Sequence, residues 1–363
     1  MCEESIFSVR SRLQRSCMLT IDRADIADSD RESSMGTKKA LLVGINYRGA
    51  SGINELNGCC NDARRLSNVL MNFYGFEGTD IDILVDEPAD EERDLPTHAN
   101  IHKYLNKLID GAQSGDTLVF SFSGHGGRVK IGSLGEDHSH DTNSDNTGYN
   151  EMICPYDHTN VLTDDDFREI VSGIPAGVNF TVISDSCNSG GLIDELVEQI
   201  GGAELKYEEE LRVSEGSGGS KRLTEDMLIS SLNNDDRISD PVDDSNIGRV
   251  LYDLYKDDSS LTFKCRFNQD AYSRAGSKSD DVGILLSACE SWEFSTDTAD
   301  GGVFTVALES VLEELRSAGE SSPTYRQLIM AVRGKIEEVS ESQHPCLYCS
   351  DTNADALFVG EFV

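Results

Sequence analysis

The sequence predicts an α/β protein with a mostly parallel central sheet that is covered by helices on both faces. Two observations favour this class. Short, mostly apolar runs have the length of buried strands, and longer segments carry apolar residues every three or four positions, as helices do. The two kinds of segment alternate along the chain, which indicates a parallel sheet covered on both faces. The 363 residues suffice for one large domain or two smaller ones.

The expected strands and helices follow one another along most of the chain. "KKALLVGIN" begins the sheet, and a helix follows it because Leu66, Val69 and Phe73 recur at helical spacing. Later runs such as "DTLVFSF" and "NFTVISD" have the length and apolar character of buried strands. We therefore expect strands at 38–46, 80–86, 116–122, 179–185, 282–288 and 355–360, and helices from 61 onward and at 99–112, 165–174, 304–315 and 325–339.

The alternation stops in a long polar stretch between residues 203 and 281. This stretch holds "SEGSGGSKR", "NNDDR" and "DDSN", and only "IGRVLYDLY" has a helical pattern. Polar segments rich in glycine and serine are typical of flexible linkers. We expect a disordered extension over 1–37, a large catalytic part over 38–202, a flexible and cleavable linker over 203–281, and a small part over 282–363.

Composition limits the possible partners. The chain has 66 Asp and Glu against 31 Lys and Arg, so its formal net charge is −35 at pH 7. This charge argues against nucleic acid or anionic membrane as a partner and permits cationic peptides and divalent cations. No apolar run approaches the roughly 20 residues of a membrane span. Ten cysteines without an export signal indicate reduced thiols, so we expect the protein in the cytoplasm, or alternatively in the nucleus. We also expect a monomer.

Two expected strands end in residues capable of covalent chemistry. "VFSFSGHGG" leads to His125 and "TVISDSCNSGG" leads to Cys187. The carboxyl ends of parallel strands meet at one edge of a sheet, so neighbouring strands would bring the imidazole and the thiol together. A nearby histidine stabilises a thiolate and protonates a leaving amine. We predict that Cys187 is the nucleophile, that His125 is its acid–base partner, and that the backbone N–H groups of Gly126 and Cys187 form an oxyanion hole.

Other roles fit these residues less well. Either residue alone is compatible with simple packing, but two of them, each after a strand and each beside glycines, favour catalysis. Ser189 is a weaker nucleophile candidate because no G-x-S-x-G sequence surrounds it. A small-ligand-binding protein is a further alternative, but neither G-x-G-x-x-G nor a phosphate-binding loop follows any expected strand.

Several sequence blocks together resemble one family. "FSFSGHGGR" and "ISDSCNSGGLIDE" are similar to the histidine and cysteine signatures of metacaspases, which are cysteine peptidases with a caspase fold. "LLVGINY", "ELNGCCNDARRL" and "LTDDDF" match further blocks of the large subunit, and "GILLSACESWEFSTDTADGGVFTVAL" resembles the start of the small subunit. The ending "QHPCLYCSDTNADALF" and the long linker resemble the type II branch. The resemblance covers about residues 38–360 outside the linker. It implies a caspase-like three-layer α/β/α sandwich that cleaves proteins after Arg or Lys.

The resemblance also assigns roles to individual residues. His125 and Cys187 match the catalytic dyad, and Asp62, Ser123 and Asp185 match the pocket that receives the basic side chain. Two carboxylates at the base of a pocket attract a cation and repel an aspartate, which agrees with this assignment. Alternatively, Asp62 caps the helix that follows it.

Calcium is the cofactor that the resemblance implies. "DTNSDNTGYNEM" lacks the turn glycine and the final glutamate of an EF-hand loop, so we reject that motif. Asp164, Asp165 and Asp194 match the calcium ligands of metacaspases, and Asn150 stands where the family usually has Asp. An amide oxygen ligates calcium but contributes no charge, so we expect weaker binding. Asn188 stands where the family usually has His after the nucleophile, and we expect altered tuning from it.

The linker contains one Lys-Arg pair, within "SGGSKRLTED". Because the expected pocket accepts a basic residue and the flanking segment is flexible, we predict a zymogen that cuts itself after Lys221 or Arg222. Before cleavage this segment would lie in the cleft as a tethered inhibitor. Lys206 and Arg212 compete less well because acidic residues crowd them. The alternative function, a catalytically silent caspase-fold scaffold acting through protein–protein contacts, is disfavoured by the intact dyad and the acidic pocket.

Overall fold

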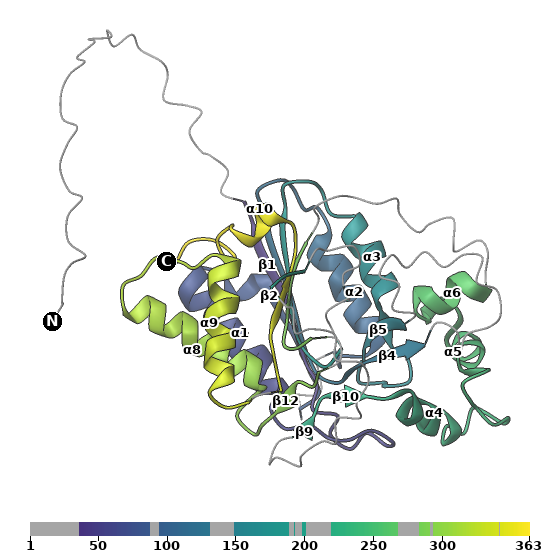
Figure 1. Ribbon diagram of the computed structural model, residues 1–363. Coiled ribbons are helices and arrows are strands. Elements are labelled where there is room, and N and C mark those ends of the chain that lie inside the picture. The colour runs from purple at the N-terminus through teal and green to yellow at the C-terminus, as the bar shows by residue number, and fades with distance from the viewer. Residues whose placement is uncertain are drawn as a thin grey trace, which may run out of the picture. The chain divides into compact units, whose positions relative to one another are not determined.

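The computed structural model describes residues 36–87, 94–130, 149–188, 192, 198–200, 219–267, 283–290, 293–340 and 342–363 (Figure 1). The extension predicted over 1–37 lies almost entirely outside these residues, so its disorder stays a prediction. Four residues named above, Ser189, Asp194, Lys206 and Arg212, also lie outside them.

Seven strands form the central sheet in the order β2–β1–β3–β7–β11–β13–β8. The first five strands in this order are parallel, and β13 runs antiparallel to both of its neighbours. The strands are β1 (Lys38–Gly44), β2 (Ile81–Val85), β3 (Thr117–Ser123), β7 (Asn179–Asp185), β8 (Glu198–Ile200), β11 (Ile284–Ser287) and β13 (Cys346–Tyr348).

Helices cover both faces of this sheet, as Figure 1 shows. One face carries α1 (Cys59–Tyr74), α8 (Val303–Ser317) and α9 (Tyr325–Glu337), and the other carries α2 (His98–Ile109) and α3 (Asp164–Ser172). A separate cluster of buried apolar side chains fills the space on each side of the sheet. The predicted α/β/α sandwich with a mostly parallel sheet is confirmed.

Two small β-structures adjoin the carboxyl ends of the central strands. A four-stranded sheet has the order β10–β4–β5–β6, and a separate two-stranded ribbon pairs β12 with β9. Both lie toward the lower edge of the molecule in Figure 1. The strands are β4 (Gly126–Lys130), β5 (Tyr149–Ile153), β6 (Leu162–Thr163), β9 (Gly219–Ser220), β10 (Arg222–Leu223) and β12 (Thr296–Asp297).

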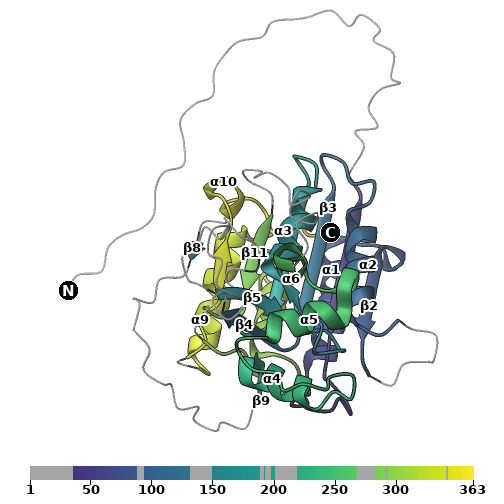
Figure 2. The ribbon, with the colours of Figure 1, turned by 90° about the vertical axis from the view of Figure 1, so that its right-hand side faces the viewer.

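The interpretation of 203–281 as a segment without regular structure is wrong for residues 219–267. The expected helix is present as α5 (Ile247–Tyr255), but α4 (Glu225–Asn233), the 3₁₀ turn η4 (Lys256–Asp258) and α6 (Leu261–Phe267) were not expected. Figure 2 shows these helices in front of the central sheet. Apolar side chains of these helices and of the segment between α4 and α5 join the core on the α2–α3 side: Leu228, Leu232, Val242, Ile247, Leu251 and Phe263.

The end of the small part also differs from expectation. Residues 355–360 form no strand and contribute only an isolated bridge between Leu357 and Thr324. The short run that enters the sheet is β13, which is followed by α10 (Asp351–Ala354). Phe358 and Val359 are buried in the core on the α8–α9 side. The apolar residues of 355–360 therefore pack beneath helices and do not pair as a strand.

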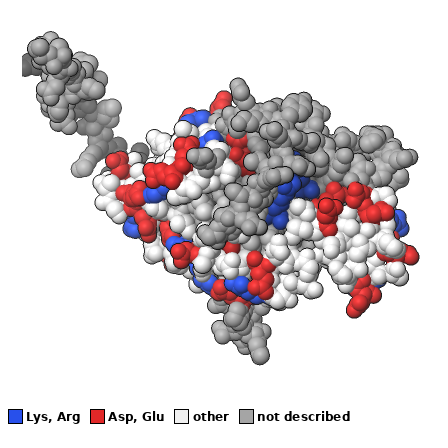
Figure 3. All heavy atoms as spheres, turned by 60° about the horizontal axis from the view of Figure 1, so that its bottom comes forward, with Lys and Arg blue, Asp and Glu red and all other residues white. Residues whose placement is uncertain are grey.

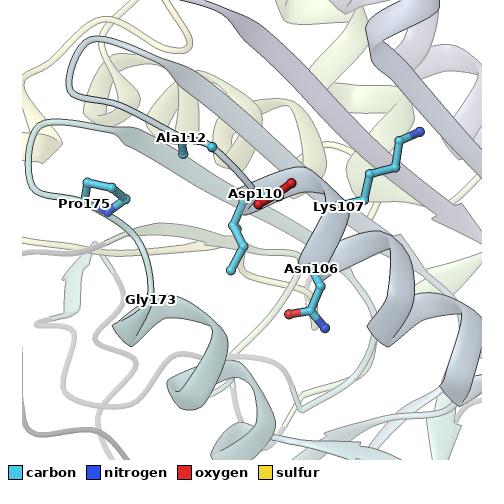
Figure 4. A pocket seen from close by; sticks show the side chains of 8 residues that line it. Asn106, Lys107, Asp110, Ala112, Gly173 and Pro175 are labelled. Atoms are coloured by element: carbon cyan, nitrogen blue, oxygen red, sulfur yellow. The ribbon is translucent and has the colours of Figure 1, made fainter.

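A surface hollow of about 720 Å³ lies far from the chemistry predicted above. Its lining comes from the last turn of α2, the segment after it and the segment after α3, including Asp110 and Pro175 (Figure 4). These segments lead into the amino ends of β3 and β7, whereas His125 and Cys187 follow their carboxyl ends. In the described part of the chain, no helix combines the length and apolarity needed to cross a bilayer.

Candidate active site

β3 and β7 are adjacent parallel strands, as the sequence argument required. Their register pairs Ser123 with Asp185, so His125 and Cys187 each follow their strand by two residues at the same edge of the sheet. The intervening backbone is tightly packed: a Cβ atom at Gly126 would lie 2.2 Å from the carbonyl oxygen of Cys187. Only glycine fits beside the histidine because the two chain segments approach so closely.

The hydrogen bonds of His125 fix its tautomer. Its Nε2 lies 2.8 Å from the carbonyl oxygen of Asn54, which can only accept, so Nε2 bears the proton. Nδ1 is buried without a hydrogen-bond partner among the described residues. The centroid of the His125 ring lies 4.7 Å from the centroid of the Tyr47 ring. Burial lowers the pKa of His125, so the neutral ring presents a lone pair at Nδ1.

The thiol of Cys187 is fully buried and lies in an environment that favours the thiolate. The backbone N–H of Ser295 donates to its Sγ at 3.1 Å. Burial alone would raise the pKa of Cys187, but hydrogen bonds from Cys289 and Ser295 outweigh this effect and lower it below the ordinary thiol value. A free thiol with this combination of partners has the properties of a nucleophile.

The predicted pocket residues Asp62, Ser123 and Asp185 come together around one ammonium group. Lys221 Nζ is completely buried, 2.8 Å from Asp185 Oδ1, 2.9 Å from Ser123 Oγ and 3.4 Å from Asp62 Oδ2. Burial alone would lower the pKa of Lys221, but the negative charges of Asp185 and Asp62 hold it well above its ordinary value. Burial, against the attraction of Lys221, raises the pKa of Asp62 to about 7.

Asp62 does not cap α1, because the residue at the N-cap position is Gly58. Its carboxylate instead accepts hydrogen bonds from Ser123 Oγ at 2.5 Å and from the Gly302 N–H at 2.9 and 3.0 Å. The alternative of a helix cap is therefore wrong for this residue.

Three pocket residues were not predicted from the sequence: Ser295, Gly302 and Thr305. Ser295 Oγ donates to Asp185 Oδ1 at 2.6 Å, and Thr305 donates to Oδ2 through both its N–H and its hydroxyl. A Cβ atom at Gly302 would lie 2.2 Å from Asp185 Oδ2 and 2.4 Å from Lys221 Nζ. The glycine pair in "TADGGVFT", just before a helix, was the available signal.

The linker enters the site as an extended strand. Ser220 pairs with Thr296 in the antiparallel β9–β12 ribbon, and the Lys221 N–H donates to the Ser295 carbonyl oxygen at 3.2 Å. On the other side of the residue, the Gly126 N–H donates to the Lys221 carbonyl oxygen at 2.9 Å. The side chain, the N–H and the carbonyl of Lys221 are thus all held.

The predicted calcium ligands Asn150, Asp164 and Asp165 lie where β5 meets the start of α3. Asn150 Nδ2 is 3.3 Å from Asp165 Oδ2, which also accepts from Thr262 of α6 at 2.6 Å. Arg168 forms an ion pair with the same carboxylate. The described residues contain no group of three or more His, Cys, Asp or Glu suited to a metal, and the predicted ligand Asp194 lies outside them.

This fold and site define a class of protein. A buried thiol and an imidazole at the ends of adjacent parallel strands, beneath helices on both faces, are the arrangement of a caspase-type cysteine peptidase. Residues 38–196 match the family model described as "Metacaspase, peptidase C14 domain". Metacaspase-9 of Arabidopsis thaliana is 36% identical, covering 92% of this chain and 99% of that protein; Metacaspase-4 of the same plant is 31% identical, covering 89% and 100%. The chain belongs to the metacaspases and is a cysteine peptidase whose substrates are proteins.

One solved structure shares this fold. Protein GSU0716 from Geobacter sulfurreducens superimposes with a TM-score of 0.54 at 21% identity, covering 88% of this chain and 97% of that one. Caspase-1 from Spodoptera frugiperda superimposes with a TM-score of 0.42 at 16% identity, covering 90% and 93%.

Proposed function

We propose that this metacaspase cleaves proteins after Lys or Arg. The observation that supports the proposal is the position of Lys221, whose ammonium group is enclosed by Asp62, Ser123 and Asp185. A buried cation with two carboxylates is stable only where charge and hydrogen bonds are both satisfied. An aspartate side chain in the same place would add a third negative charge, so cleavage after Asp is disfavoured.

The chemistry follows from the contacts around the Lys221 carbonyl. His125 Nδ1 takes the proton of the Cys187 thiol, and the thiolate adds to the carbonyl carbon while the negative charge that forms on oxygen is stabilised by the Gly126 N–H. The C–N bond then breaks, and the amine leaves with the proton from His125. Water, losing a proton to His125, hydrolyses the thioester, and the thiolate is restored.

The proposal is tested with fluorogenic peptides ending in Arg, Lys or Asp, assayed with calcium and with excess chelator. We expect hydrolysis of the Arg and Lys peptides in calcium and none of the Asp peptide, because only a cation satisfies the two carboxylates. Efficient hydrolysis of the Asp peptide contradicts the pocket assignment. Inertness toward every peptide, in a folded protein with calcium, favours the scaffold alternative.

We further propose that the full chain is a zymogen activated by cutting its own linker. Lys221 occupies the pocket and hydrogen-bonds through its carbonyl to Gly126, so it blocks other substrates while its own bond to Arg222 lies at the nucleophile's edge of the sheet. A tethered segment acts at high effective concentration, which makes it an effective inhibitor until it is cut. The geometry favours cleavage after Lys221 over cleavage after Arg222.

Incubation of the purified full chain with calcium is expected to give a fragment whose N-terminal residue is Arg222, read by Edman sequencing. Lys221→Arg should still be cut there, because the pocket accepts either cation, whereas Lys221→Gln should be cut far more slowly. Cys187→Ala is the control and should stay intact. A first cleavage at another bond in the wild-type chain contradicts the assignment.

Calcium dependence is also part of the proposal, with Asn150, Asp164, Asp165 and Asp194 holding the ion. The donor chemistry fits, since all four side chains offer oxygen and calcium binds oxygen ligands almost exclusively. Bound calcium would supply positive charge to a chain whose net charge is −35. Exposed acids near this end of the molecule add to the attraction for cations, and Figure 3 shows acidic side chains over the end formed by α4, α5 and α6. These acids include Asp236, Asp240, Asp243, Asp244, Asp257 and Asp258.

A further inference from the structure

The residue after the proposed cleavage site has an aromatic partner. The guanidinium carbon of Arg222 lies 5.2 Å from the centroid of the Phe294 ring. A guanidinium over an aromatic face is attracted by the ring's negative π-face and stacks on it with its plane. Among the described residues, Arg222 forms no ion pair. The contact with the Phe294 ring is therefore the interaction that depends on the positive charge of Arg222.

The backbone around Arg222 is held by pairing with a neighbouring strand. β10 pairs in parallel with β4, with Arg222 opposite Gly126 and Leu223 opposite Gly127. A Cβ atom at Gly127 would lie 2.2 Å from the Leu223 carbonyl oxygen, so the strand lies directly on the glycine edge. Leu223 is buried in the core on the α2–α3 side. The chain beyond the cleavable bond is therefore bound in an extended form, as a substrate would be.

The backbone of Phe294 is also held in place, beside the catalytic thiol. The next residue, Ser295, donates its N–H to the nucleophile and accepts the N–H of Lys221. The preceding residue, Glu293, is held by the N–H and the ring of His344. Both neighbours are buried, so the position of the Phe294 backbone beside the catalytic thiol is set by contacts on either side.

We propose that Phe294 forms a subsite for a planar cation directly after the cleaved bond, so that preferred substrates are dibasic, with Lys or Arg before the bond and Arg after it. This inference rests on the proposed cleavage after basic residues and adds the residue on the other side of the bond. Arginine should be preferred over lysine because its flat, weakly hydrated guanidinium stacks on the ring, whereas an ammonium is a strongly hydrated point charge.

The test compares internally quenched peptides Gly-Ser-Lys-Xaa-Leu in which Xaa is Arg, Lys, Ala or Glu. The enzyme is the full chain carrying Arg222→Ala, activated by calcium, so that its own arginine does not compete for the subsite. The bond that is cut is identified by mass spectrometry of the products, because the Arg and Lys peptides offer a second basic residue. For cleavage of the Lys–Xaa bond we expect kcat/KM for the Arg peptide to exceed that for the Ala peptide roughly two- to fivefold, the range of an exposed cation–π contact, with the Lys peptide between them.

Two substitutions then separate the aromatic face from simple bulk. Phe294→Leu should bring the ratio of Arg to Ala cleavage to about 1, since the π-face is lost, and Phe294→Tyr should preserve the ratio. Equal cleavage of the Arg and Ala peptides by the enzyme with Phe294 intact, or an unchanged ratio in Phe294→Leu, overturns the subsite and leaves cleavage after Lys standing. Failure to cut any peptide of the panel overturns the proposed function together with it.

Discussion

Cys187→Ala is expected to reduce peptide hydrolysis on the order of 10⁶-fold, to background, and to stop self-cleavage of the linker. The substitution removes the only atom that forms the covalent bond, while the side chain is small and fully buried, so the fold should survive. Initial rates on an Arg-ending peptide, together with the thermal unfolding midpoint, measure both effects.

The matched control is Cys349→Ala, which changes another fully buried cysteine, on the α8–α9 side of the sheet. It should lose some stability but keep its activity. If Cys187→Ala keeps its activity, another thiol is the nucleophile, and Cys59 or Cys60 is the next candidate. Both are poor candidates, because burial raises the pKa of each thiol.

Asp185→Asn is expected to lower kcat/KM for Arg and Lys peptides about 30-fold to several thousand-fold, which corresponds to roughly 2–5 kcal/mol for losing one partner of a buried charge pair. Asp185 makes the shortest contact with the ammonium of Lys221, and asparagine keeps the volume while removing the charge. The same substitution should weaken the grip on Lys221 in the uncut chain, so the rate of self-cleavage should also fall.

The control for Asp185→Asn is Asp116→Asn. Asp116 is also a buried carboxylate, but it lies beside the amino end of β3 and accepts N–H groups of Thr37 and Gln113. It should cost stability without changing the preference for basic peptides. If Asp185→Asn, correctly folded, keeps wild-type kcat/KM on Arg peptides, the pocket has been assigned to the wrong carboxylate.

Local sequence patterns determined much of this protein. Short, mostly apolar runs identified β1, β3, β7 and β11, because such runs are typical of strands buried on both faces. His125 and Cys187 could be paired from the sequence, since the ends of parallel strands share an edge and glycines permit close approach. Family resemblance supplied Asp62, Ser123 and Asp185, and the structure brings all three around one lysine.

Tertiary structure decided what local pattern does not encode. Ser295, Gly302 and Thr305 follow the linker in the sequence, and they reach the pocket only because β11 pairs with β7. The sequence did not predict the regular structure of residues 219–267. Their apolar side chains are few and widely spaced, and they pack only against distant elements. The position of Lys221 depends on both. The sequence around it, rich in glycine and serine, predicted flexibility, but this part of the chain forms ordered strands because one cation satisfies two buried carboxylates that lie far from it in the chain.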